Sequence, residues 1–144
     1  MDSNLKENSA IQNHINILQN VISRMAGNSA NSKTWAITII SAIVVLLIDR
    51  SKSGVFYIAY VPLAMFFFLD CFYLGLERHF RNIYNEFVEG LDSDKFDYKM
   101  VYKLQGPKKL SKKIGLTICG AWSFSTTPFY IIIAVLIFII QKLS

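Results

Sequence analysis

Hydrophobic and polar positions are segregated along this chain into long blocks. Apolar residues dominate 36–48, 55–76 and 114–140, whereas polar residues collect in the first 33 positions and in 77–113. A helix needs about 20 apolar residues to cross the roughly 30 Å hydrocarbon core of a bilayer. The pattern therefore predicts an all-α integral membrane protein with three transmembrane helices.

The N-terminal block predicts a separate amphipathic helix over residues 8–26, in which apolar side chains recur at alternating steps of four and three. This apolar stripe consists of Ile11, Ile15, Leu18, Ile22 and Met25. Gly27 is expected to end the helix, and the Asn and Ser residues of 28–32 can cap the next one. The opposite face carries little charge, so the stripe is expected to pack on the protein's own spans or to join two copies of the chain.

The first two spans are expected to form a hairpin. The first covers residues 34–48, with Trp35 at the membrane interface, and the second starts at Val55 after a polar turn. Pro62 predicts a kink in the second span. No helix breaker follows until Gly90, so this helix is expected to leave the bilayer and project into the cytoplasm.

The remaining blocks predict a cytoplasmic loop and a third span. Apolar and polar residues alternate over 96–104, which indicates a short extended segment in the loop. The apolar block 114–140 is too long for one upright crossing and is expected to divide at 123–128, so that 114–124 is either a re-entrant half-helix or part of the approach to the span. The expected units are a cytoplasmic N-terminal helix and cap (1–33), a transmembrane hairpin (34–76), a basic cytoplasmic helix and loop (77–113) and a C-terminal transmembrane segment (114–144).

The distribution of charge predicts the topology. The net charge is +5, and nine of the fifteen Lys and Arg residues fall within 77–113, against two in the turn 49–54. Basic loops remain in the cytoplasm, so the N-terminus and residues 77–113 are expected there. Because spans flank the basic region, its charge indicates cytoplasmic retention and contact with anionic lipid rather than binding of nucleic acid.

Asp70 lies inside the second apolar block, where an ionised carboxylate is costly unless it is paired or hydrated. Asp70, Tyr73, Glu77 and Arg81 follow one another at steps of three and four, so a helix places them on one ridge. The cations expected on the same side of the membrane are Arg24, Lys33, Arg78 and Arg81. The ridge is expected to lock helices together, to gate a pore or, less readily, to relay protons.

The chain shows no pattern typical of an enzyme, such as a phosphate-binding loop, a nucleophile elbow or paired carboxylates. No enzymatic activity and no cofactor are therefore expected. His14 and His79 lack neighbouring ligands at metal-binding spacing and are expected to be interfacial or solvated. Cys71 and Cys119 lie in or beside apolar runs and indicate no disulfide framework. The hydroxyl residues before Pro128 are expected to pack at helix contacts rather than to coordinate ions.

Two stretches of the chain resemble a known group of proteins. The first covers residues 24–38 and includes RMAGNS, and the second covers 68–78 with the sequence FLDCFYLGLER. Both are similar to small bacterial multi-pass membrane proteins found beside TIR-domain or nucleotide-signalling genes in antiviral defence operons. The matching positions are Arg24, Asn28, Lys33, Trp35, Asp70, Tyr73, Glu77 and Arg78.

This resemblance implies an oligomeric effector in the bacterial inner membrane. A partner such as a TIR-domain protein would sense infection, and the effector would then permeabilise or depolarise the membrane. A function of another class also fits the sequence, namely a non-conducting membrane anchor or scaffold that recruits a soluble partner through residues 77–113. The three spans contain no internal repeat, which argues against a self-contained transporter.

Overall fold

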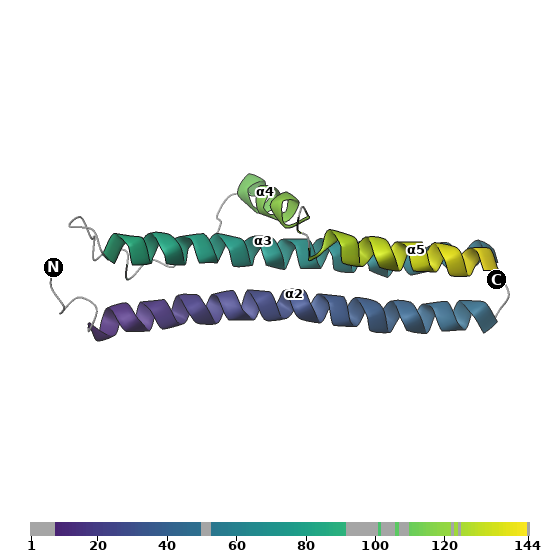
Figure 1. The fold of residues 1–144 in the computed structure, drawn as a ribbon, viewed down its shortest axis with the longest axis horizontal. Coiled ribbons are helices and arrows are strands. Elements are labelled where there is room, and N and C mark those ends of the chain that lie inside the picture. The colour runs from purple at the N-terminus through teal and green to yellow at the C-terminus, as the bar shows by residue number, and fades with distance from the viewer. Residues whose placement is uncertain are drawn as a thin grey trace.

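The protein is built around two long helices that lie side by side. The computed structural model describes residues 8–49, 53–91, 101, 106, 110–121, 123 and 125–143. Every regular element within these residues is helical, as the sequence predicts. Helices α2 (Ser9–Asp49) and α3 (Tyr60–Leu91) run antiparallel along the whole length of the molecule (Figure 1).

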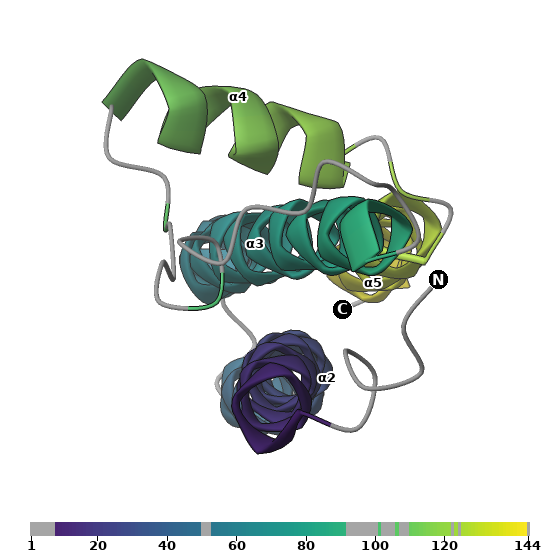
Figure 2. The same ribbon diagram turned by 90° about the vertical axis from the view of Figure 1, so that its left-hand side faces the viewer.

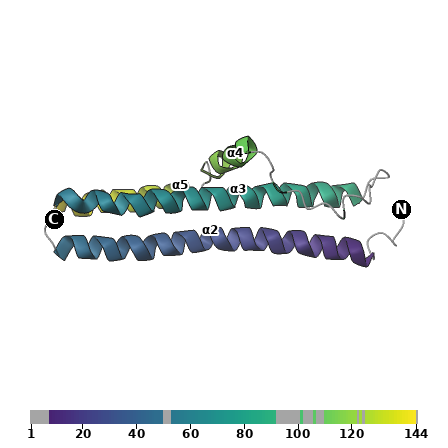
Figure 3. The same ribbon diagram turned by 180° about the vertical axis from the view of Figure 1, so that it is seen from behind.

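Three shorter helices complete the fold. The 3-10 helix η1 (Ser53–Ala59) leads into α3. Helix α5 (Thr127–Leu143) returns alongside the first half of α3 and ends near the connection between the two long helices, as Figure 3 shows from behind. Helix α4 (Leu110–Ala121) lies on the side of α3 opposite to α2 and crosses α3 steeply (Figure 2).

The prediction that Gly27 ends a first helix is wrong, because α2 is continuous over 41 residues. The N-terminal cap is Asn8, whose Oδ1 accepts a hydrogen bond from the backbone N–H of Ala10 at 3.0 Å. Further along, the hydroxyl of Ser32 donates to the carbonyl oxygen of Asn28 at 2.9 Å instead of capping a new start. One glycine lowers helix stability by only about 1 kcal/mol, which packing along α3 outweighs.

Gly27→Ala is therefore expected to stabilise the protein by about 0.5–1 kcal/mol. Gly27 is exposed, and a methyl group added there would meet nothing within 4 Å. Thermal unfolding in detergent, followed by circular dichroism, measures the change. The reverse substitution Ala30→Gly, at an exposed position of the same helix, should lower stability by a similar amount. A loss of stability in Gly27→Ala would contradict a continuous α2.

The second long helix continues unbroken past its apolar half to Leu91, which confirms the prediction that this helix extends to about Gly90. The boundaries at 33/34 and 76/77 between the units expected from the sequence therefore fall inside α2 and α3, respectively. Pro62, for which the sequence predicts a kink within the second span, lies near the start of α3. It occupies the first turn of α3, just after the change from 3-10 to α geometry, where a missing N–H is tolerated.

The hairpin has two apolar cores, one near each end. The first joins α2, the η1–α3 segment and α5, and its buried members are Ala36, Ile40, Val44, Ala59, Leu63, Tyr130 and Ile137. The second joins the start of α2 to the end of α3, and its buried members are Ile11, Phe87, Leu91 and Val101. The half of the molecule around the first core is called the apolar half below, and the half around the second core the polar half.

Two helical segments, Ser9–Ile48 and Phe56–Leu91, are long and apolar enough to cross a membrane. Helix α5 is also apolar but has only 17 residues. Helix α4 ends at Ala121 and α5 begins at Thr127, so the break between them overlaps the predicted interval 123–128. The extended segment predicted over 96–104 lies outside the described residues except for Val101, and the described part of the chain contains no strand.

Candidate functional site

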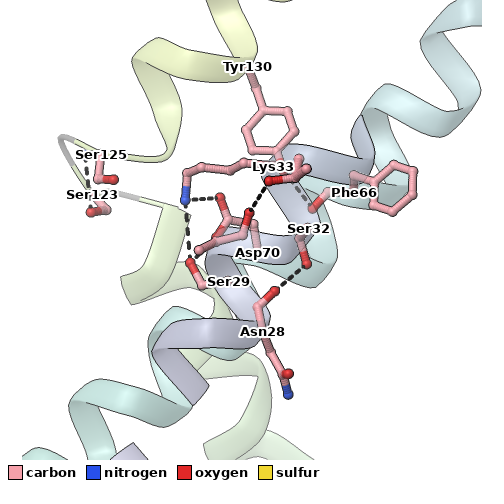
Figure 4. Close-up of polar contacts among 11 residues, drawn as sticks. Asn28, Ser29, Ser32, Lys33, Phe66, Asp70, Ser123, Ser125 and Tyr130 are labelled. Carbon is pink, nitrogen blue, oxygen red and sulfur yellow. Dashed lines mark hydrogen bonds and ion pairs between the residues drawn. The ribbon is translucent and has the colours of Figure 1, made fainter. Parts of the chain in front are cut away.

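A buried polar cluster connects α2 to α3 near the middle of the hairpin. Its members are Ser29, Lys33 and Asp70 (Figure 4). The Nζ atom of Lys33 lies 2.6 Å from Oδ2 of Asp70, and the hydroxyl of Ser29 donates a hydrogen bond to Oδ1 of the same carboxylate. The Asp70 side chain is 0% exposed, whereas that of Lys33 is 20% exposed. Both carboxylate oxygens thus have a partner on α2.

Helical geometry of α2 explains how two of its side chains reach one carboxylate. Ser29 and Lys33 are four residues apart and therefore lie on the same face of the helix. Lys33 Nζ also lies 3.4 Å from the Ser29 hydroxyl, so the three polar groups form one connected network. Such a network is stabilising only while all its members are paired, because a buried polar group without a partner is costly.

The chain around the start of α5 also meets α3 beside the cluster. Tyr130, near the start of α5, donates a hydrogen bond to the carbonyl oxygen of Phe66 at 3.1 Å, one turn before Asp70. Next to it the chain turns between α4 and α5, with the Ser125 N–H 3.4 Å from the Ser123 hydroxyl (Figure 4). Cys71 and Thr126 are fully enclosed here as well. Asp70 is therefore shielded from solvent by α2, α3 and the chain around the start of α5.

The predicted ridge on α3 changes from buried to exposed along its length. Asp70 and Glu77 are buried, Tyr73 is half-buried and Arg81 is exposed. Arg81 Nη2 lies 2.5 Å from Glu77 Oε1, which is the four-residue pairing that the sequence allows. Because this pair stays on α3, only Asp70 links the ridge to another helix by an ion pair among the described residues.

Of the four cations considered for Asp70, the structure selects Lys33. Arg24 is exposed on α2 more than two turns before Lys33, and Arg81 is occupied by Glu77. Sequence reasoning included Lys33 among the candidates but did not consider Ser29. The signal for Ser29 is its position four residues before Lys33, since a lysine and a hydroxyl on one helix face can share a carboxylate.

The apolar stripe on α2 lies against α3. Ile11, Leu18 and Met25 are buried, and Ile15 and Ile22 are partly buried. At the open end of the hairpin, Ile11 packs with Phe87 and Leu91 of α3. The stripe therefore forms contacts within one chain, which is one of the two roles predicted for it.

Two glycines set the close approach of α4 to α3. A Cβ added at Gly120 would lie 2.9 Å from the carbonyl carbon of Cys71, and one added at Gly75 would lie 2.6 Å from that of Leu116. These neighbours are backbone atoms, which cannot turn aside as a flexible side chain can. Small residues allow helix backbones to approach closely, as at these two positions. Sequence reasoning did not single out either glycine.

His14 departs from the prediction of a solvated or interfacial side chain. It is buried in the polar half, and its ring centroid lies 4.6 Å from that of Phe87. Burial lowers the pKa of His14 from its ordinary value of 6.5, and a hydrogen bond to the backbone of Val101 opposes this shift only in part.

A pH dependence of stability follows from the lowered pKa of His14. The unfolded chain takes up a proton at a higher pH than the folded chain, so stability present above pH 6.5 is lost as pH falls through the folded-state pKa. We expect the stability of the protein to decrease between about pH 7.5 and about pH 5.5, and to decrease less in His14→Gln. Thermal unfolding over this range measures the difference. Identical pH profiles for the two proteins would contradict the prediction.

The described residues contain no group of three His, Cys, Asp or Glu side chains placed to hold a metal ion. Comparison of the chain with protein families, with curated proteins and with solved structures finds no match. The buried cluster of Ser29, Lys33 and Asp70 is the candidate functional site of this chain.

Proposed function

We propose that this chain is an integral membrane protein whose apolar half lies in the bilayer. The support is a belt of apolar side chains on the outside of that half, on α2, on the η1–α3 segment and on α5. Its members are 46% to 69% exposed and include Trp35, Ile37, Val45, Leu46, Ile48, Tyr57, Ile58, Val61, Met65, Phe68, Ile131, Ile132, Val135, Leu136, Phe138 and Ile139. A soluble monomer rarely exposes so many large apolar side chains on one half of the molecule.

The dimensions of the apolar half also suit a bilayer. The seven residues of η1 rise about 14 Å, and residues 60–69 of α3 add about 15 Å. Together they span nearly the roughly 30 Å of hydrocarbon and end at Asp70. In this proposal α2, α3 and α5 each cross the membrane once, and the polar cluster lies at the cytoplasmic boundary. The basic excess of residues 77–113 supports a cytoplasmic position for the polar half in the bacterial inner membrane.

The proposed activity is that of a membrane effector, which opens or depolarises the bilayer when a partner triggers it. The observation that carries this proposal is the buried ion pair of Lys33 and Asp70. A passive anchor needs no such pair, because apolar residues of similar volume often hold helices together equally well. Ionisable residues on helices that cross a membrane often belong to ion paths or switching elements.

Several copies would have to act together, since the described parts of α2, α3 and α5 pack around an apolar core rather than around an aqueous path. The apolar belt offers the surface through which copies could associate, since the stripe on α2 is already covered. The resemblance of residues 24–38 and 68–78 to defence-associated proteins supports a trigger from a TIR-domain or nucleotide-signalling partner.

The test is a measurement of membrane potential in bacteria that express the chain, with a potential-sensitive dye, before and during phage infection. We expect depolarisation in infected cells with the wild-type chain and a weaker response with Asp70→Asn. The matched control is Asn20→Ala, an exposed position on α2, which should respond as the wild type does. Equal expression and helical content of the three proteins exclude misfolding. An unaltered dye signal in infected cells would refute the effector function.

A membrane anchor or scaffold is the second candidate, and the length of the polar half favours it. Both long helices continue far beyond the apolar belt, and their outer faces carry exposed polar residues such as Asn13, Asn16 and Asn20. This function predicts that vesicles containing the purified chain remain impermeable to a trapped dye while the full chain retains a soluble cytoplasmic protein.

A further inference from the structure

We propose that α4 is an interfacial helix that lies on the cytoplasmic surface of the membrane and binds anionic phospholipid. This inference deepens the proposed function and rests on the embedding of the apolar half. It concerns α4, which unlike α5 does not run alongside the first half of α3, and it assigns a ligand class to a surface that the effector proposal does not use.

The direction of α4 is the first argument. In the end view α4 extends across the hairpin, whereas in the side view it is foreshortened and tilted relative to α3 (Figures 1 and 2). The two views agree that α4 runs across the long axis of α2 and α3. If that axis crosses the bilayer, α4 lies near the plane of the membrane, the orientation of an interfacial helix.

The level of α4 along α3 is the second argument. Gly75 of α3 meets Leu116, and Gly120 of α4 meets Cys71, so α4 contacts α3 just beyond Asp70. The last exposed apolar residue of the belt on α3 is Phe68, within one turn of Cys71. Helix α4 therefore meets α3 at the level where the exposed apolar residues of α3 end, which in the proposed embedding is where hydrocarbon gives way to headgroups.

The residues of α4 provide the third argument. Its inner side is fixed by Leu116 and Gly120, whereas Ile114 and Ile118 are 52% and 58% exposed. These two isoleucines are four residues apart and form an apolar strip with no partner in the described part of the chain. Lys112 and Lys113 belong to the first turns of the same helix. Apolar residues beside lysines are typical of helices that bind anionic membrane surfaces.

A fluorescent probe on α4 tests the proposal in the full chain. Ile118→Cys, in a Cys119→Ser background, is labelled with an environment-sensitive dye and reconstituted in phosphatidylcholine vesicles with and without phosphatidylglycerol. Unlabelled Cys71, which is buried, is checked in the background protein without the added cysteine. The reference labels are Asn20→Cys in the polar half and Leu46→Cys in the apolar belt.

We expect the label at position 118 to be protected from iodide and to be quenched most by a nitroxide attached near the lipid headgroup. Quenching by iodide equal to that at position 20 would overturn the proposal, because α4 would then lie in water. Strongest quenching by a nitroxide near the end of the acyl chain would overturn it in favour of a re-entrant α4. Protection from both kinds of quencher would also overturn it, because protein, such as a second copy, would then cover the strip.

The reference label at position 46 separates failure of this inference from failure of the embedding. If iodide reaches that label, the apolar half is not in lipid and both proposals fail. The preference for anionic lipid is tested with the double variant Lys112→Gln/Lys113→Gln. The increase in headgroup-level quenching caused by phosphatidylglycerol should fall by about fivefold for each lysine removed, which corresponds to about 1 kcal/mol. An unchanged dependence on phosphatidylglycerol would overturn the anionic preference.

Discussion

Lys33→Met is expected to destabilise the protein by about 3–5 kcal/mol, the largest effect of any single substitution proposed for α2. The reason is that Asp70, which is 0% exposed, would keep a buried carboxylate without its cation. Asp70→Asn should cost less, because the 20% exposed Lys33 side chain can turn its ammonium toward water and the amide oxygen of Asn can still accept the hydrogen bond from Ser29.

The double variant Lys33→Met/Asp70→Asn decides whether the two residues act as a pair. With both charges removed, no ion remains buried, so the double variant should be more stable than Lys33→Met alone. The expected coupling energy is about 2 kcal/mol or more, above the few tenths found for independent sites. Reversible unfolding in mixed detergent micelles, followed by circular dichroism, provides the four free energies of unfolding.

Arg24→Met is the matched control for the first prediction. It removes a cation from the same helix at an exposed position and should change stability by no more than about 0.5 kcal/mol. If the effects of Lys33→Met and Asp70→Asn were simply additive, the ion pair would contribute nothing to the association of α2 with α3.

Gly120→Ala and Gly75→Ala are expected to separate α4 from α3. The added methyl group would overlap backbone atoms of Cys71 in the first case and of Leu116 in the second. Overpacking of this kind lowers stability by about 1–3 kcal/mol when neighbouring side chains can adjust, and by more when the neighbours are backbone atoms. The readout is the reactivity of Cys71 toward a maleimide in a Cys119→Ser background, since Cys71 is buried while α4 is docked.

Gly115→Ala provides the control for this second prediction. It lies on the same helix, but an added Cβ would meet nothing within 4 Å. The substitution should therefore leave Cys71 protected and raise the helix propensity of α4. Equal protection of Cys71 in the Gly120→Ala and Gly115→Ala proteins would show that α4 does not depend on close backbone contact with α3.

Much of the fold could be predicted from the sequence, because long apolar blocks and helical periodicity are local signals. The continuation of α3 to Leu91 and the break between α4 and α5 follow from the presence or absence of helix breakers. The same rule about helix breakers failed at Gly27, where the helix continues although a break is predicted. A local rule gave one glycine more weight than the packing of the whole of α2 along α3.

The candidate site was harder to predict, because it depends on which residues meet across two helices. Asp70 was identifiable as a costly charge in an apolar block, and Lys33 as one of four possible partners. Only the register between α2 and α3 selects Lys33 and adds Ser29. The burial of His14 likewise depends on Phe87 and on the backbone of Val101, which lie far away in sequence.

The unbroken course of α2 has a mechanical consequence. A straight rod of 41 residues is about 60 Å long and carries no hinge between its two ends. If the Lys33–Asp70 contact acts as the pivot, a tilt of about 5° moves either tip by roughly 2–3 Å. Force applied by a binding protein near Ile11 would thus be delivered, as in a lever, directly to the far end at Ile48.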